Sequence, residues 1–138
     1  MMLYIGSADN NVYALDVRTG QQLWNFTTRG QVFSSPTVVG GTLYVGSIDK
    51  NIYALDAATG LKLWNFTTGN YVGSSPTVVG GTLYIGSWDH NVYALDAATG
   101  NELWSYATGD YVGSSPTVVN GTLYVGSGDD NVYALQFL

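Results

Sequence analysis

The sequence predicts an all-β protein, and three observations support this prediction. The 138 residues repeat with a period of 40, so that residues 41–80 and 81–120 are identical at 29 of 40 positions. A period of this length is typical of stacked supersecondary units, none of which buries its apolar surface alone. Tyr, Thr, Val and Gly dominate the composition, which favours strands joined by tight turns. No segment has a 3.6-residue apolar period long enough for a helix.

The second unit shows the first two of the four strand-like runs from which each unit is built. The first run is Ser34–Val39, and the second is Thr42–Ser47. The pair Gly40-Gly41 lies between them, and its glycines tolerate the positive φ of a two-residue hairpin turn. The fourth unit has Asn120-Gly121 at this place, the preferred type I′ pair. Different residue pairs that suit one turn type predict a hairpin here.

The third run, Ile52–Leu55, and the fourth run, Lys62–Thr68, are joined by residues 56–60. In this turn Asp56 can cap backbone N–H groups and Gly60 can take the left-handed conformation. The runs are apolar on both faces, whereas a sheet exposed to water on one side would alternate apolar with polar residues. Small sheets covered on both faces predict blades packed face to face around an axis, a β-propeller. A β-solenoid is the alternative, although its rungs usually have shorter periods than 40 residues.

The repeat divides the chain into units 1–40, 41–80, 81–120 and a partial unit 121–138 of one propeller segment. The chain begins at the second strand of a blade and ends with the third, so we expect an arc of about four four-stranded blades with incomplete terminal blades. If each end face offers about 500 Å² of apolar area, burying it contributes on the order of 12 kcal/mol before entropy costs. We therefore expect a homo-oligomer, a dimer that closes a ring of about eight blades, with open fibres as the alternative.

Three units carry the spacing Ala-x-Asp-x-x-Thr-Gly-x-x-x-Trp. This spacing closely resembles the tryptophan-docking motif of the pyrroloquinoline-quinone (PQQ) repeat family of β-propellers, and the resemblance covers essentially the whole chain. It implies four-stranded blades whose outer-strand tryptophans pack against the neighbouring blade. The fourth unit departs from the motif, because Gln136 replaces the aspartate and no tryptophan follows. The motif positions are Asp16, Gly20 and Trp24 in the first unit, Asp56, Gly60 and Trp64 in the second, and Asp96, Gly100 and Trp104 in the third.

The resemblance does not extend to the cofactor that gives the family its name. Quinoprotein dehydrogenases of the family hold PQQ with a vicinal disulfide and a calcium ion bound by acidic and amide side chains. This chain has no cysteine, and its single glutamate, Glu102, precedes an expected outer strand. We therefore predict no catalytic, cofactor-binding or metal-binding residue and no enzymatic activity. The family resemblance favours an extracytoplasmic or cell-surface location, although residues 1–7 enter the repeat directly without the basic segment of a signal peptide.

Composition argues against two classes of partner. The formal net charge is −6 and only four residues are Lys or Arg, so the chain cannot form the basic stripe that nucleic acid requires. No apolar run approaches the roughly 20 residues of a membrane-spanning helix. Neither nucleic acid nor a membrane span is therefore expected.

The units differ most in four loops that we expect on one rim, residues 8–11, 48–51, 88–91 and 128–131. These loops are either ligand contacts or Asx-type turns with unconstrained tips. As ligand contacts, the candidates are Trp88, which could stack on a sugar or a peptide, and His90, the single histidine.

Two further constellations have simpler interpretations. His90 lies beside Asp89 and near Ser87, but neighbouring residues of one hairpin do not supply the geometry of a catalytic triad. Residues 129–131 lack the full oxygen ligand set of a calcium-binding loop. We expect Ser34, Ser74 and Ser114 to lie on innermost strands that line the channel, in a packing role.

These observations lead to one principal functional hypothesis. The chain is expected to be a non-enzymatic propeller scaffold or binding module that self-assembles into a closed ring, with itself and a protein or glycan as partners. The close similarity of the units also fits a recently amplified or designed repeat without an evolved ligand. A quinoprotein-like oxidoreductase remnant and a multivalent carbohydrate-binding propeller are the alternatives.

Overall fold

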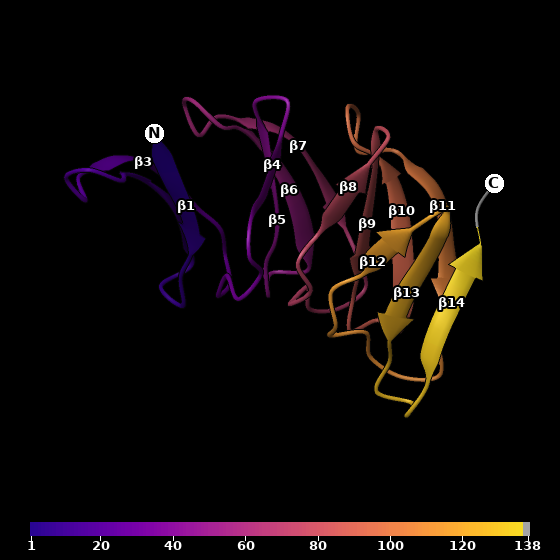
Figure 1. Cartoon of the computed structure of the whole chain (residues 1–138). Helices are drawn as coiled ribbons and strands as arrows, with labels where there is room; N and C mark the ends of the chain where they lie inside the picture. Colours follow the sequence, from indigo (N-terminus) through magenta and orange to yellow (C-terminus); the bar gives the residue numbers. More distant parts are fainter. Residues whose placement is uncertain (137–138) are drawn as a thin grey trace.

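The computed structural model describes residues 1–136, and these form fourteen strands and no helix. The all-β prediction is confirmed, and the described part of the chain has no helix that could cross a membrane. Figure 1 shows the strands in chain order. They are β1 (Met2–Gly6), β2 (Asn11–Asp16), β3 (Gln22–Thr27), β4 (Thr37–Val39), β5 (Thr42–Gly46), β6 (Asn51–Asp56), β7 (Lys62–Thr67), β8 (Thr77–Val79), β9 (Thr82–Gly86), β10 (Asn91–Asp96), β11 (Glu102–Ala107), β12 (Thr117–Val119), β13 (Thr122–Gly126) and β14 (Val132–Gln136).

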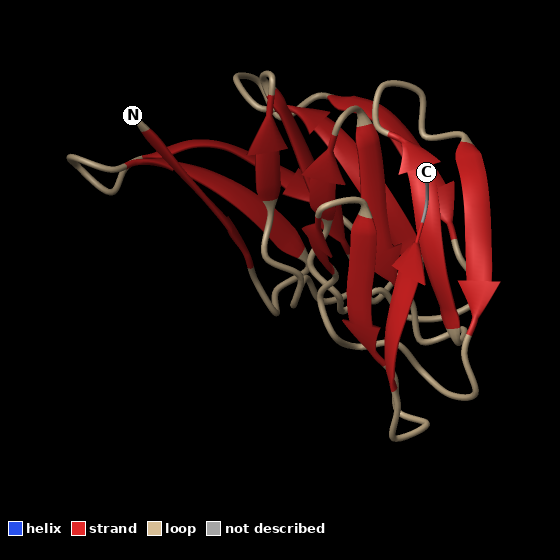
Figure 2. Ribbon diagram, turned by 45° about the vertical axis from the view of Figure 1, so that its right-hand side comes forward, coloured by secondary structure: helices blue, strands red, loops and turns tan. Residues whose placement is uncertain are grey.

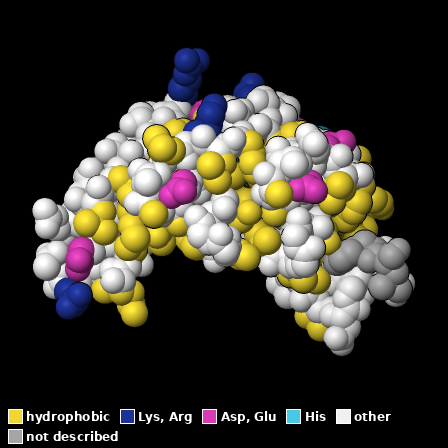
Figure 3. Space-filling model, turned by 90° about the horizontal axis from the view of Figure 1, so that it is seen from above, with side chains coloured by type: hydrophobic (Ala, Val, Ile, Leu, Met, Phe, Trp, Pro, Cys, Tyr) yellow, Lys and Arg dark blue, Asp and Glu magenta, His cyan; other side chains and the backbone are white. Residues whose placement is uncertain are grey.

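The strands form four antiparallel sheets in which neighbours in sequence are neighbours in space. Blade 1 contains β1 to β3, blade 2 β4 to β7, blade 3 β8 to β11 and blade 4 β12 to β14. Figure 2 shows that nearly all of the described backbone outside the turns is strand. Seen from above in Figure 3, the molecule is a curved arc with a hollow on one side. The architecture is that of an incomplete β-propeller, as the repeat predicts.

The short turn between the first two strands of a blade has the predicted geometry. Gly40 and Gly41 have φ values of +58° and +80°, and Asn120 and Gly121 have +49° and +76°. Positive φ at both central residues is the requirement of a type I′ turn, which glycine and asparagine meet at low cost. The hairpin prediction is confirmed.

The first strands of blades 2, 3 and 4 are shorter than predicted. In blade 2 it begins at Thr37, so the expected run Ser34–Val39 is wrong over its first half. Pro36 has no N–H to give to a ladder, and the Ser34 hydroxyl instead accepts the N–H of Gly46 at 3.0 Å. Ser34 and its counterpart Ser74 are buried, whereas Ser114 is exposed. The burial of the first two fits the expected packing role and differs from the expectation that they line an open channel.

The core lies between the blades. One cluster of buried side chains joins blade 2 to blade 3, and it contains Tyr44, Ile52 and Ala54 from one blade and Leu83 and Ile85 from the other. Two further clusters of the same kind join blade 1 to blade 2 and blade 3 to blade 4. Both faces of a middle blade are therefore buried, which explains why its strands are apolar on both sides.

The outer faces of blades 1 and 4 lack this cover. Leu3 of β1 is 49% exposed, whereas its counterpart Leu43 of β5 is fully buried. On blade 4, Val132 is 79% exposed, whereas its counterpart Ile52 is fully buried. The same residue positions are therefore core in the middle of the arc and surface at its two ends.

Candidate functional site

The outer-strand tryptophans of blades 1 and 2 lie on the turn of the next blade. The indole N–H of Trp24 donates to the carbonyl of Ala57 at 3.0 Å, and that of Trp64 donates to Ala97 at 3.1 Å. A Cβ atom at Gly60 would lie 2.5 Å from the ring of Trp24, closer than any real contact. Glycine is therefore required in this turn for the ring to approach the backbone.

An aspartate holds each of these turns in shape. Asp56 Oδ1 accepts the backbone N–H groups of Ala58 at 2.9 Å and Thr59 at 3.0 Å, and Gly60 has a φ of +79°. Asp16 and Asp96 accept the corresponding bonds in their own blades. The spacing from aspartate to tryptophan thus combines two features of one blade. The capped turn receives the tryptophan ring of the preceding blade, and the tryptophan lies on the turn of the next blade.

The first and third copies of the motif sit in different surroundings. At Gly20 an added Cβ would meet nothing within 4 Å, because no blade precedes blade 1 in the described structure. Trp104 packs against Tyr84 with ring centroids 6.0 Å apart, and both rings line a cavity of about 680 Å³. The counterpart of Ala57 in blade 4 is Phe137, which lies outside the described residues.

The four loops 8–11, 48–51, 88–91 and 128–131 lie at the lower ends of the blades in Figure 1, and we call them the lower rim. They connect β1 to β2, β5 to β6, β9 to β10 and β13 to β14. They are Asx-type turns. Asp49 Oδ1 accepts the backbone N–H of Asn51 at 3.0 Å, and Lys50 between them has a φ of +80°. The second oxygen, Asp49 Oδ2, accepts the Tyr53 hydroxyl and the backbone N–H of Arg29 in blade 1, the latter at 3.1 Å.

The rim aspartates therefore also connect neighbouring blades, a role that the sequence analysis missed. Asp89 accepts the backbone N–H of Gly69, and Asp129 that of Gly109, each at 2.9 Å. Burial acts to raise the pKa of Asp89, but hydrogen bonds from Tyr93, Gly69 and Asn91 outweigh it and hold that pKa below its ordinary value. The signal in the sequence was the constant spacing of an aspartate and a tyrosine four residues later in all four units.

The innermost segments of neighbouring blades are also joined by hydrogen bonds. The backbone N–H of Ser35 donates to Ser75 Oγ at 2.8 Å, and Thr37 Oγ1 donates to the carbonyl of Pro76 at 2.7 Å. Ser75 donates in the same way to Ser115 Oγ at 3.0 Å. The Ser-Ser-Pro-Thr runs thus connect blades 2, 3 and 4, which accounts for their small hydroxyl residues.

Exposed aromatic side chains form a row on the lower rim. The rings of Tyr71 and Trp88 have centroids 5.5 Å apart, and those of Trp88 and Tyr111 are 5.0 Å apart. Phe33, which is 60% exposed, lies across a groove of about 400 Å³ that Tyr71 and Trp88 also line. We call Phe33, Tyr71, Trp88 and Tyr111 the aromatic row. Trp88 was predicted as a rim residue, but its aromatic neighbours were not.

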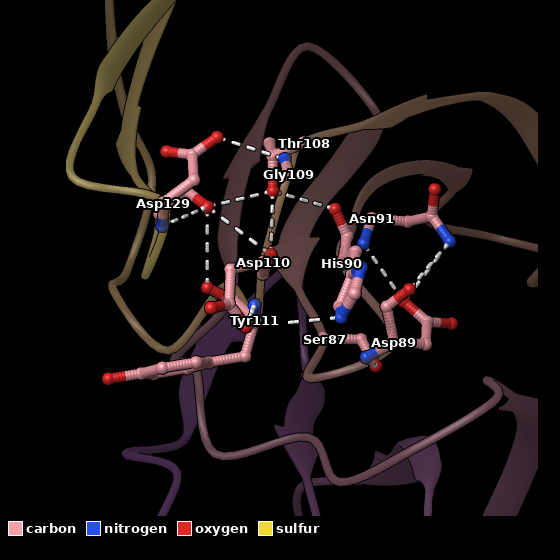
Figure 4. Close-up of polar contacts among 10 residues, drawn as sticks. Ser87, Asp89, His90, Asn91, Thr108, Gly109, Asp110, Tyr111 and Asp129 are labelled. Carbon is pink, nitrogen blue, oxygen red and sulfur yellow. Dashed lines mark hydrogen bonds and ion pairs between the residues drawn. The ribbon is translucent and has the colours of Figure 1, made fainter.

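The row is held in place by the blade junctions. The backbone N–H of Trp88 donates to the carbonyl of Tyr71 at 2.8 Å, and that of Gly128 donates to Tyr111 at 2.7 Å. Figure 4 shows the ring of Tyr111 projecting away from the hydrogen bonds that fix its backbone neighbours. The rings are therefore presented to solvent from a rigid backbone.

The second rim candidate, His90, has an acidic neighbour. Its Nε2 lies 3.9 Å from Asp110 Oδ1, and both side chains are about half exposed (Figure 4). Ser87 is buried, and its hydroxyl bonds to Thr68 Oγ1 of blade 2 at 3.0 Å, so it is not available to His90 as a nucleophile. Within residues 1–136 no group of three or more His, Cys, Asp or Glu side chains could hold a metal ion.

Two structural comparisons describe natural proteins with this fold. BamB from Moraxella catarrhalis superposes with a TM-score of 0.87 at 26% identity, over 98% of this chain and 42% of that one. A quinohemoprotein alcohol dehydrogenase, ADHIIG from Pseudomonas putida HK5, gives 0.81 at 24% identity, over 91% of this chain and 27% of that one. The chain thus spans less than half the length of either protein. The likeness to the dehydrogenase concerns the fold alone.

A designed protein has the same fold, and a family model matches the sequence. The computationally designed Ika4 protein superposes with a TM-score of 0.87 at 17% identity, over 98% of this chain and 84% of that one. The model of the family described as outer membrane protein assembly factor BamB matches residues 1–72 and 68–138, which together cover the whole chain. The chain therefore belongs to the BamB-like family of PQQ-repeat β-propellers.

Proposed function

We propose that this chain is a non-enzymatic propeller scaffold that closes by pairing with a second copy and holds a protein partner on its lower rim. The family description names an assembly factor, a role that requires binding proteins rather than transforming a substrate. The observation that carries the proposal is the exposure of apolar positions at the two ends of the arc that are fully buried in its middle. Contiguous apolar faces of this kind mark interaction surfaces in soluble proteins.

The chemistry of the end faces fits another blade as their cover. Blade 1 presents Leu3 and Ile5, the counterparts of residues that pack against the preceding blade elsewhere. Blade 4 presents Tyr124 and Val132, the counterparts of residues that pack against the following blade. The C-terminal face of one copy is therefore complementary to the N-terminal face of another, and two such contacts close a two-fold ring.

The motif residues have a structural role in this proposal. The tryptophans, aspartates and glycines set the spacing and orientation of successive blades rather than contacting a substrate. The residues are Trp24, Trp64, Trp104, Asp16, Asp56, Asp96, Gly20, Gly60 and Gly100.

The residues of this chain do not fit a PQQ and calcium site. The sequence has no cysteine for the disulfide clamp, and the carboxylates of residues 1–136 do not gather into a group that could hold a metal ion. The rim aspartates use their oxygens on backbone N–H groups and tyrosine hydroxyls instead. We therefore derive no redox step for this propeller.

The test of self-association uses two leucine variants. Leu3→Glu places a charge on the N-terminal end face, and Leu61→Glu places one in a turn where the side chain is 69% exposed. The counterparts of Leu61 are Gln21 and Asn101, so the repeat already accepts polar residues there. Light scattering should give a dimer for the wild type and Leu61→Glu and a monomer for Leu3→Glu. A mass that is the same for all three chains would contradict the proposal.

A further inference from the structure

The aromatic row has properties that neither the repeat nor the blade junctions explain. Trp88 takes the place of Ala8, Ile48 and Gly128 in the other units, so the row is not a consequence of the repetition. Its residues are between 39% and 60% exposed, although the rings of Tyr71, Trp88 and Tyr111 lie against one another. An exposed apolar cluster on a rigid backbone marks a binding surface.

The polar tips of the row have no partners within the described chain. The indole N–H of Trp88 and the hydroxyls of Tyr71 and Tyr111 form no hydrogen bond among residues 1–136. Half-buried tyrosine and tryptophan side chains combine an apolar body with a donor at the tip, which suits a ligand that has apolar rings and free carbonyl groups. The row offers three such donors on neighbouring rings.

The shape of the row favours an extended ligand with small rings. Neighbouring rings touch and are tilted by 50° and 46°, so they form a ridged surface rather than a flat platform. The groove lies between these rings and Phe33. The centroids of Tyr71 and Tyr111 are at most about 10.5 Å apart, so the row can span about one turn of a polyproline II helix, about 9 Å. A polyproline II segment has no internal hydrogen bonds, so its carbonyls are free to accept from the row.

The lining of the groove argues against a sugar. Its residues are Gln31, Phe33, Ile48, Tyr71, Gly73, Trp88 and Gly113, among which Gln31 carries the single side-chain amide and none carries a carboxylate. A pyranose ring has several hydroxyls that each need a polar partner, and besides the tips of Tyr71 and Trp88 this lining supplies one amide and no carboxylate. Burying unpaired hydroxyls would oppose its binding.

The Tyr111 end of the row has acidic neighbours. Asp110, which is half exposed, precedes Tyr111 in the sequence and lies 3.9 Å from His90 Nε2. The exposed Asp130 lies in the rim loop whose Gly128 donates its N–H to the Tyr111 carbonyl. The chain as a whole carries a net charge of −6. A ligand with basic residues at the end that lies against Tyr111 is complementary to this arrangement.

We propose that the aromatic row binds a proline-rich segment of a partner protein in the polyproline II conformation, with basic residues of that segment beside Asp110. This proposal rests on the proposed scaffold function and names the chemistry of the partner. The proline rings pack against the exposed faces of Tyr71, Trp88 and Tyr111, and the indole and phenol donors bond to the carbonyls of the segment. The preformed conformation of the segment limits the entropy lost on binding.

The test is a titration of the full chain with a synthetic peptide of eight prolines followed by two arginines, capped at both ends and monitored by tryptophan fluorescence and calorimetry. Two probes serve as comparisons, a peptide of alternating Gly and Ser with the same two arginines, and cellohexaose. We expect saturable binding of the proline peptide at micromolar to millimolar concentration and at least tenfold weaker binding of the other two.

Three variants assign the binding to the row. Trp88→Ile introduces the residue that unit 2 has at this place, so the fold is kept, and it should weaken peptide binding about tenfold. Asp110→Asn should weaken it several-fold for the arginine peptide and not for an uncharged proline peptide. Tyr106→Ala removes an exposed aromatic ring on β11, away from the row, and should leave the affinity for the proline peptide unchanged.

The outcomes separate this proposal from the proposed function. Binding of the proline peptide that Trp88→Ile and not Tyr106→Ala weakens would support the proposal, whatever the oligomeric state. Equal binding of the Gly-Ser peptide, preferential binding of cellohexaose or no binding of any probe would overturn it. The mass of the wild-type chain, measured without peptide, reports on self-association alone.

Discussion

The middle of the arc and its two ends contain the same residues in different surroundings. Leu43 and Leu83 are fully buried between blades, and Leu3, at the same position of the repeat, is 49% exposed. The local structure is the same in all three, since β1, β5 and β9 have the same length and pair with the following strand in the same register. Strand formation thus follows from the repeat, and core formation follows from the presence of a neighbouring blade.

The largest expected effect distinguishes a buried position from an end position. Leu83→Ala should lower the free energy of unfolding by about 3 kcal/mol, because it leaves a cavity between blades 2 and 3. Leu3→Ala should have an effect that shrinks when the protein is diluted below its dissociation constant, because in the proposed dimer a second copy covers this residue. Urea unfolding at several protein concentrations measures both. A concentration-independent loss for Leu3→Ala would contradict the account.

The turn glycines give the next effect. Gly60→Ala should cost on the order of 3 kcal/mol, because it combines a φ of +79° with a clash against the Trp24 ring. Gly20→Ala has a φ of +72° and open space around it, so it should cost about 1 kcal/mol from the backbone alone. Thermal unfolding of the two variants gives the comparison. Equal losses would mean that the tryptophan contact contributes nothing.

The indole hydrogen bond has a smaller effect that can be isolated. Trp64→Phe keeps a ring against blade 3 and removes the donor to the Ala97 carbonyl, so we expect a loss of about 1 to 2 kcal/mol. Trp88→Phe is the matched control, since its indole N–H bonds to nothing among residues 1–136, and its stability should be unchanged. If both variants lose the same amount, the bond to Ala97 is not the cause.

The smallest effect is a dependence of stability on pH at the rim. The pKa of Asp89 is lowered in the folded chain, so its hydrogen bonds stabilise the fold above the unfolded pKa, about 3.9, and this contribution disappears as the pH falls through the folded pKa. The free energy of unfolding of the wild type should exceed that of Asp89→Asn by no more than about 1 kcal/mol at pH 7, because the Asp89 carboxylate is partly exposed to solvent. Urea unfolding at pH 7 and pH 2.5 should show a smaller advantage at the lower pH, which lies below the unfolded pKa. An advantage of the same size at both pH values would exclude the carboxylate as its source.

Most of the fold could be predicted from the sequence because its signals are local. The hairpin at Gly40-Gly41 and the capped turn at Asp56 depend on residues within a few positions of each other, and the repeat presents each signal several times. The predicted start of the first strand of blade 2 was wrong. A hydrogen bond from the Gly46 N–H to the Ser34 hydroxyl replaces a backbone bond between strands, and no local sequence pattern indicates such a contact.

The candidate site was predicted less completely. Trp88 was recognisable because it interrupts the repeat, but Tyr71 and Tyr111 reach it only through the packing of successive blades. The bond from Gly69 to Asp89 likewise joins residues of different blades, so the spacing of the motif could not reveal it. Contacts across blade junctions require the curvature of the arc, which the sequence of one unit does not contain.

The measurement that tests the central claim most directly is the mass of the wild-type chain by sedimentation equilibrium over a range of micromolar concentrations. We predict twice the 14.7 kDa of one chain, since in the proposed ring the exposed face at Leu3 is covered by the face at Val132 of a second copy. A folded species of 14.7 kDa at every concentration would show that the end faces are stable in water, and the account of the arc as half of a ring would be wrong.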